Sequence, residues 1–297
     1  MRKIGLFSLL LAGALVLSAC GNEAVSDAGN TGRDREDREE SNEEESNGEE
    51  LPEGYRDWGY IDSLTDEVIG ETTIGDNEYI LHSHEHKTYS STTIYEYVSV
   101  VVYDPEDIRK EVEFDGETYP VIYLDKVIGS EITEIDIPSF IWKIGTFCMN
   151  EAENLTSVTF HEGLTVIQNN AFYESKIETV EIPSSVRRIG NAAFEGCKNL
   201  RSVTFGENSR LSELGSTVFR LCPSLEEITI PAMVHEIKSS VFEYDDSLEY
   251  IYFEHTEGWQ AELKLNGEEF LDEMDVTDPE VNADNLRGEY VDYTWSR

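Results

Sequence analysis

Apolar and polar positions between residues 132 and 253 form a pattern that recurs about every 23 residues. When the turns are aligned, three apolar columns stand at constant spacing. The columns are Ile132, Leu155, Ile177, Leu200, Leu225 and Leu248; then Ile135, Val158, Val180, Val203, Ile228 and Ile251; then Ile137, Phe160, Ile182, Phe205, Ile230 and Phe253. A period of this length predicts a solenoid in which every turn is one structural unit.

Each turn is expected to contain one short strand. Val180 and Ile182 alternate with polar neighbours, so 179–182 reads as a strand with one face inward, and Pro183 ends it. Burying about six apolar side chains contributes roughly 1.5–3 kcal/mol each. Ordering every residue of the turn costs about 1.5 kcal/mol, so an isolated turn is unstable. The turns must therefore stack, and their strands should form a parallel sheet.

The end of each turn is marked by a large apolar residue that follows a smaller one. This closing column contains Met149, Phe172, Phe194, Phe219 and Phe242. Gly145, Gly190 and Gly215 precede it and are expected to allow a tight bend. The fourth turn keeps the pattern only if two extra residues are placed around 207–210.

These columns carry a family resemblance. The segment IETVEIPSSVRRIGNAAFEGCKN at 177–199 resembles the BspA-like leucine-rich repeats, whose pattern is approximately LxxIxIPxxVxxIGxxAFxxCxxL. The match is looser at 132–154, where Met149 replaces the phenylalanine, and at 155–176, where Gln168 replaces the glycine. The resemblance implies a mainly β solenoid, a right-handed leucine-rich-repeat superhelix. It also implies a surface scaffold that binds partners and has no shared active site.

Residues between the buried columns should point outward and form one continuous face. Their side chains are short, hydroxylated or acidic, and the last turn ends in two tyrosines. The candidate binding residues on this face are Glu181, Thr204, Glu227, Thr229, Tyr250 and Tyr252. Tyrosine is a frequent energetic anchor in interfaces. A solvated face without a ligand is the alternative.

The segment 55–131 is expected to be a β-rich N-terminal cap. NEYILHS, TIYEYVSVVVY and KEVEF are rich in β-branched and aromatic residues, and Asp115-Gly116 predicts a hairpin turn. The stretch 112–130 resembles the degenerate turn that precedes the regular repeats in the same family. This cap would cover the first open edge of the solenoid. Trp58 and Tyr60 are expected to pack within it.

Three histidines in this cap alternate along one predicted strand. His82, His84 and His86 would share a face, which is compatible with a zinc, copper or nickel site. Same-face side chains on a strand stand about 7 Å apart, so three on one flat strand rarely close around one ion. A hydrated polar face is therefore favoured over a metal site.

The first residues have the order of an export signal. Arg2 and Lys3 precede an apolar run that is short for a membrane span, and LSAC at 17–20 follows. This ending resembles the lipobox of bacterial lipoproteins, in which the cysteine becomes the lipid-bearing N-terminus. We expect residues 1–19 to be a lipoprotein signal peptide and Cys20 to be lipidated. An ordinary signal peptide with a chance cysteine is the alternative.

The charge of the chain is strongly negative and uneven. The formal net charge is −40, and residues 22–54 contain 13 acidic residues against three arginines. The segment 20–54 is expected to be a disordered acidic tether. Such acidity argues against nucleic acid as a partner and against direct binding to anionic lipid headgroups.

Cysteines and motifs give no sign of chemistry. Cys148 stands in the small-residue column, and Cys197 and Cys222 share a later column, so repeat position explains all three as core residues. A disulfide between Cys197 and Cys222 on adjacent turns is left open. GxSxG, HExxH, P-loop and EF-hand motifs are lacking, so neither catalysis nor a cofactor is expected.

After residue 253 the period stops, and 254–297 is expected to be a C-terminal cap. Thr277-Asp278-Pro279-Glu280 has capping-box spacing and predicts a short helix near 279–287. Trp259, Tyr290, Tyr293 and Trp295 supply bulk, and a hydrophobic lid is favoured over a ligand site.

The sequence therefore predicts a non-catalytic protein that is exported and lipid-anchored to the bacterial cell membrane, facing outward. Its solenoid at 132–253 would bind an extracellular protein or glycan. A metal-capturing lipoprotein that uses the three histidines is the alternative, and an envelope scaffold without a specific ligand is a third. The oligomeric state is left open.

Overall fold

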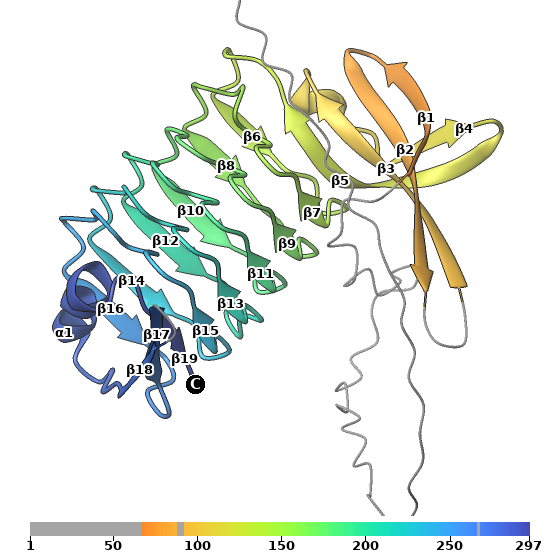
Figure 1. Ribbon diagram of the computed structural model, residues 1–297. Helices are drawn as coiled ribbons and strands as arrows, with labels where there is room; N and C mark the ends of the chain where they lie inside the picture. The colour runs from red at the N-terminus through yellow and green to blue at the C-terminus, as the bar shows by residue number, and fades with distance from the viewer. Residues whose placement is uncertain (1–66, 88–91, 266–267) are drawn as a thin grey trace, which may run out of the picture. The chain divides into compact units, whose positions relative to one another are not determined.

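The computed structural model describes residues 67–87, 92–265 and 268–297, which all belong to one compact unit. Its central part is a β-solenoid (Figure 1). One strand of each turn lies on one face of the solenoid: β6 (Glu134–Asp136), β8 (Ser157–Thr159), β10 (Thr179–Ile182), β12 (Ser202–Phe205), β14 (Glu227–Ile230) and β16 (Tyr250–Phe253). These strands pair in parallel as β6–β8, β10–β12 and β14–β16. The predicted solenoid is confirmed, but these strands form three separate parallel pairs instead of the single sheet expected.

The inward and outward columns are also as predicted. In β10, Val180 and Ile182 are buried while Thr179 and Glu181 are exposed, and β14 has the same alternation. Pro183 follows β10 directly. The loop 206–212, between β12 and β13, accommodates the extra residues of the fourth turn.

Each of the first five turns contains a second strand that the sequence did not predict. These strands are β7 (Lys143–Ile144), β9 (Val166–Ile167), β11 (Arg188–Ile189), β13 (Glu213–Leu214) and β15 (Glu236–Ile237). They pair in parallel in one continuous ladder. The second residue of each strand is fully buried. The buried column was visible in the sequence, but a strand of two residues is too short to show alternation.

The closing phenylalanines stack through the core. Ring centroids are 5.1 Å apart between Phe172 and Phe194, 5.7 Å between Phe194 and Phe219, and 5.8 Å between Phe219 and Phe242, with nearly parallel planes. Met149 occupies the same column in the first turn and is buried. The column is thus a continuous apolar spine.

The sequence suggested that the glycines allow the tight bend before this spine through their backbone freedom. The structure gives them a different role. The left-handed backbone falls instead on the residue two positions after each glycine, for example Phe147 (φ 55°), Ala192 (φ 56°) and Thr217 (φ 57°). The glycines are required because successive turns approach closely. A Cβ at Gly190 would lie 2.7 Å from the backbone nitrogen of Asn169. The expected bend is present, but glycine occupies this column because a larger residue would collide with the preceding turn.

The N-terminal part is a sheet that continues the ladder of second strands. It contains β1 (Glu67–Ile74), β2 (Asn77–Lys87), β3 (Thr92–Val102), a short 3-10 helix η1 (Pro105–Asp107), β4 (Glu111–Phe114) and β5 (Glu117–Val127). Asp115 and Gly116 form the predicted two-residue turn, both with positive φ. Because β5 pairs in parallel with β7, this sheet covers the first edge of the solenoid, as expected.

The C-terminal part closes the other end. It contains β17 (Gln260–Leu265), β18 (Glu268–Glu273), α1 (Pro279–Asp284), a π-helical turn η2 (Asn285–Glu289) and β19 (Thr294–Ser296). β19 pairs antiparallel with β15, which places the fully buried Trp295 against Ile237. Trp259 is buried too, and Tyr290 and Tyr293 pack against the core. These aromatic side chains extend the core beyond the last repeat.

The helix begins where predicted and ends earlier. Its N-cap is Asp278, whose carboxylate accepts hydrogen bonds from the backbone N–H groups of Glu280 and Val281. The hydroxyl of Thr277 does not cap the helix and donates to Asp275, at 2.6 Å. The buried Asn282 fastens α1 to the solenoid, because its amide donates to the carbonyl oxygens of Ile251 and Val276.

Candidate binding face

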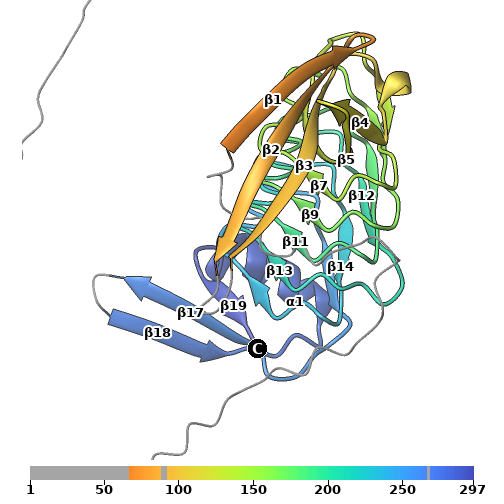
Figure 2. The same ribbon diagram turned by 90° about the vertical axis from the view of Figure 1, so that its right-hand side faces the viewer.

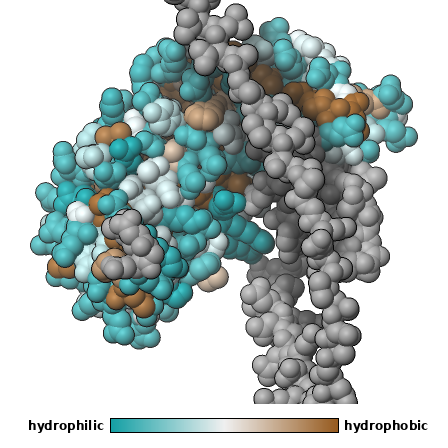
Figure 3. All heavy atoms as spheres, viewed as in Figure 1, coloured by the Kyte–Doolittle hydropathy of each residue, from teal (hydrophilic) through white to brown (hydrophobic). Residues whose placement is uncertain are grey.

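The face formed by the outward side chains of β6, β8, β10, β12, β14 and β16 is called the strand face below. The side of the repeat region seen in Figure 3 is mostly hydrophilic, with only small separate apolar spots. Strand residues two apart share a face, so each strand adds two outward side chains. The face is therefore a regular array with two outward side chains from each strand.

The structure places the six predicted binding residues on this face in two groups. Glu181 lies beside Thr204 in the β10–β12 pair. In the β14–β16 pair, Glu227 lies beside Tyr250 and Thr229 beside Tyr252. β12 and β14 are not hydrogen-bonded as strands, so the two groups belong to separate ladders.

The two tyrosines form the largest apolar feature of the strand face. Their ring centroids are 6.2 Å apart with planes at 21°. Tyr252 is 41% exposed, whereas Tyr250 is half-buried. The negative charges of Glu280 and Glu249 raise the pKa of Tyr250 above its usual range, so its hydroxyl stays protonated and can donate a hydrogen bond. The pair offers aromatic area together with polar tips.

A hydrogen bond and an ion pair join successive turns at the edge of this face. Nε2 of His161 lies 2.6 Å from the carboxylate of Asp136, and Arg201 pairs with Glu178. Each partner comes from the neighbouring turn. Exposed pairs of this kind contribute little to stability, about 0–1 kcal/mol each, but they fix the side chains at the edge of the face.

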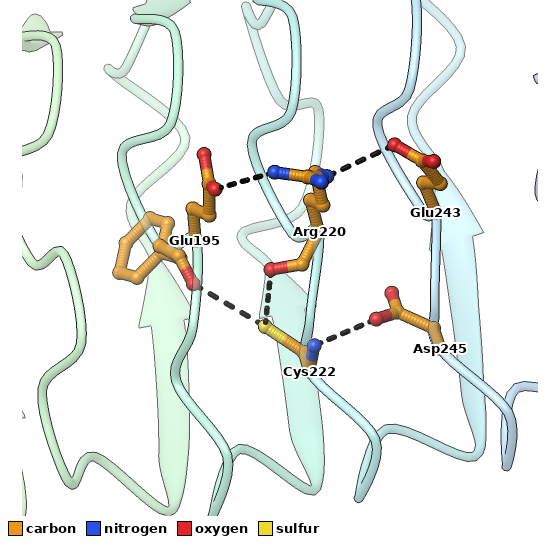
Figure 4. Close-up of polar contacts among 6 residues, drawn as sticks. Glu195, Arg220, Cys222, Glu243 and Asp245 are labelled. Atoms are coloured by element: carbon orange, nitrogen blue, oxygen red, sulfur yellow. Dashed lines mark hydrogen bonds and ion pairs between the residues drawn. The ribbon is translucent and has the colours of Figure 1, made fainter.

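A second polar cluster was missed in the sequence (Figure 4). Arg220 is held between two turns: its Nη1 lies 3.0 Å from Glu195 and its Nε lies 2.9 Å from Glu243. Its guanidinium also lies 5.3 Å from the ring centroid of Tyr244. Comparing charges column by column would have found this alternation of acid, base and acid. Because both carboxylates are already paired with the guanidinium, the cluster connects turns rather than receiving a ligand.

Asp245, in the next turn, is fully buried. Its Oδ1 accepts a hydrogen bond of 2.6 Å from the backbone N–H of Cys222, and its Oδ2 has no partner. Desolvation raises the pKa of this carboxyl to about 8. Asp245 occupies the repeat column of Cys197 and Cys222. A charged residue in a column of small core residues was the sequence feature that could have identified it.

The three described cysteines are free and buried. The thiols of Cys197 and Cys222 each lie 3.2 Å from a carbonyl oxygen of the preceding turn, of Phe172 and Phe194 respectively. Burial raises the pKa of Cys197 to about 12 and also raises that of Cys222. The two thiols are therefore hydrogen-bonded core residues, and neither has the properties of a nucleophile.

The predicted metal ligands are described only in part. His82 lies on β2, half-buried, with Nε2 2.8 Å from the hydroxyl of Ser99 and its ring stacked on Tyr97 at 5.1 Å. The side chains of His84 and His86 lie outside the described residues. No group of three potential metal ligands occurs among those that are described. The metal hypothesis thus stays a prediction.

Cys20, Trp58 and Tyr60 also lie outside the described residues. Within the described ranges, no helix is long and apolar enough to cross a membrane.

Comparison with known proteins supports the repeat assignment. Residues 128–249 match the BspA type Leucine rich repeat region in six copies. The pneumococcal vaccine antigen PcpA has a similar structure, with a TM-score of 0.51 and 21% identity over 69% of this chain and 54% of that chain. This chain thus spans about half the length of the pneumococcal antigen.

A leucine rich cell surface protein from Faecalibacterium prausnitzii A2-165 gives a TM-score of 0.47 and 18% identity, over 72% of this chain and 62% of that chain. No curated protein matches the sequence significantly. Residues 128–249 are therefore a region of BspA-type leucine-rich repeats, and the fold is similar to that of the pneumococcal antigen.

Proposed function

We propose that this protein is an exported lipoprotein, anchored through Cys20, whose strand face binds an extracellular protein without catalysing a reaction. The observation that carries the proposal is the paired tyrosines at the end of the strand face, Tyr252 exposed and Tyr250 half-buried. Exposed tyrosines are enriched among residues that dominate binding energy.

The chemistry of the face supports a protein partner. Hydroxylated and acidic side chains give a hydrogen-bonding surface around the tyrosines, as at the polar rim of many interfaces. The chain has a formal net charge of −40, so a partner with a basic surface would be attracted over a distance, more strongly at low salt.

The test uses soluble protein without the first 20 residues, immobilised and exposed to extracellular proteins. The variant Tyr250→Ala/Tyr252→Ala should reduce capture at least about tenfold. Tyr244→Ala is the matched control, since Tyr244 is an exposed tyrosine in the Arg220 cluster, off the strand face. Equal capture by both variants would show that the strand face is not the binding surface.

The class of partner is decided by treating the ligand preparation. Protease digestion should abolish capture and periodate oxidation should leave it unchanged. The opposite result would make the partner a glycan. Thermal unfolding of both variants shows whether the change in capture is local.

A further inference from the structure

The outer edge of β18 pairs with no other strand among the described residues. β17 pairs with β18 on one side and with β19 on the other, and β18 is the last strand of the large sheet among the described residues. Figure 2 shows β17 and β18 extending away from the solenoid as a hairpin with β18 outermost. An open edge carries unpaired backbone donors and acceptors that can accept a further strand.

The backbone groups available at this edge follow from the hydrogen-bond pattern. The N–H of Met274 donates to the carbonyl oxygen of Trp259, at 2.9 Å. Since alternate residues of an antiparallel strand direct their backbone groups to opposite sides, Phe270 and Asp272 also face β17. Glu269, Leu271 and Glu273 therefore direct their N–H and C=O groups outward.

The opposite end of the sheet differs. β1 also lies at an edge among the described residues, but its pairing with β2 shifts between Val68 and Gly70, which is a bulge. Bulges twist an edge and hinder the addition of another strand. The register of β18 on β17 is regular from Gln260↔Glu273 to Leu265↔Glu268. The edge of β18 therefore has no bulge that would hinder the addition of another strand.

The side chains of β18 define what can pair with it. The strand EEFLDE has four carboxylates and no basic residue. Residues 269–273 are all exposed, with Phe270 at 43% and Leu271 at 56%. Lys264 compensates part of this charge, because it pairs with Glu262 and lies 3.8 Å from Glu269.

This chemistry excludes two occupants. A second β18 would place carboxylates against carboxylates, and like charges directly opposite each other destabilise a strand pair. The acidic segment 22–54 of the same chain meets the same repulsion. We propose that the edge of β18 receives an extended, basic segment of another protein as an added strand, in which lysine or arginine alternates with apolar residues.

Binding is measured with a synthetic peptide in which three valines alternate with four lysines, and with its glutamate counterpart as control. Fluorescence anisotropy with the whole chain should show that the lysine peptide binds and the glutamate peptide does not, up to about 1 mM peptide. If the lysine peptide does not bind, the acidic edge serves only to prevent self-pairing and the proposal is wrong.

Leu271→Pro tests whether the backbone edge is used. Proline is tolerated where the N–H faces solvent, so the fold should persist, as judged by an unchanged unfolding midpoint. The loss of this donor and the added ring should weaken binding of the lysine peptide at least about tenfold. Leu271→Ala keeps the N–H and should weaken binding less. Undiminished binding to the folded proline variant would overturn strand addition and leave only charge attraction.

Charge reversal tests the chemistry of the partner. Glu269→Lys/Glu273→Lys should reverse the peptide preference, with the lysine peptide weakened about tenfold and the glutamate peptide gaining binding. An unchanged preference would place the peptide elsewhere on this acidic protein and contradict the assignment to β18.

Discussion

The residues that close each turn hold neighbouring turns together. The ring of Phe194 stacks on Phe172 at 5.1 Å and on Phe219 at 5.7 Å. Phe194→Ala should therefore lower the free energy of unfolding by roughly 3–5 kcal/mol, because a cavity opens between two turns. Thr179→Ala on the outward face should cost less than about 0.5 kcal/mol. Urea denaturation measures both, and similar losses would mean that the inward and outward columns are misassigned.

Asp245 is the residue whose charge state should change stability most directly. Burial raises its pKa from 3.8 to about 8, so the folded state keeps a proton that the unfolded state releases above about pH 4. A raised carboxyl pKa means that stability falls as the pH rises from about 4 to 8. The Asp245→Asn variant has no carboxyl that can ionise, so this fall in stability should disappear. Its amide oxygen can still accept the hydrogen bond from the backbone N–H of Cys222.

The Asn variant should match the wild type near pH 4 and exceed its free energy of unfolding by at least about 1 kcal/mol at pH 8. Comparing the two proteins at each pH cancels the titration of the other carboxylates. A difference that does not grow with pH would show that the buried carboxyl is not the cause.

At the scale of elements, local alternation decided what the sequence could predict. Val180 and Ile182 identified β10, and Asp115-Gly116 identified the turn between β4 and β5. The two-residue strands had no alternation to detect. The pairing of β19 with β15 joins segments about 60 residues apart, for which the repeat period has no information.

The candidate site was predictable to the same extent. The repeat columns placed Glu181, Thr204 and the tyrosines on one face. The repeat columns could not show that β12 and β14 are unpaired, because hydrogen bonding between two strands depends on the spacing of their turns in space. No partner of Arg220 was predicted from the sequence, although its acidic neighbours stand in the same column of adjacent turns.

The closing strand makes a prediction at this scale. Trp295 is fully buried, and its ring stacks on Phe253 with centroids 6.4 Å apart. Trp295→Ala should reduce the free energy of unfolding by about 3–5 kcal/mol and loosen β19. Hydrogen exchange should then increase in β15, which β19 covers, before it increases in β10. Uniform exchange throughout the repeats would show that β19 does not act as a separate cap.

For the whole molecule, the solenoid depends on its two ends. The ladder of second strands is continued by β5 at one end of the repeats and by β19 at the other, so this ladder has no open edge within the repeats. In a stacked array each turn is stabilised by its neighbours, and terminal segments with a polar outer side keep it soluble. This arrangement leaves the strand face and the edge of β18 as the surfaces proposed to bind.

Attachment to the membrane is the prediction for the whole molecule. Cys20 follows the basic and apolar segments and ends the LSAC motif, so its thiol is the expected site of lipidation. Two acyl chains anchor a protein stably, whereas one chain binds only marginally. Cys20→Ala should therefore move the protein from the membrane fraction to the soluble fraction or the medium, and incorporation of labelled palmitate should stop. Cys148→Ala, which changes a buried cysteine of the solenoid, should remain with the membrane. If the Cys20 variant sediments with membranes as fully as the wild type, the anchor lies elsewhere in the chain.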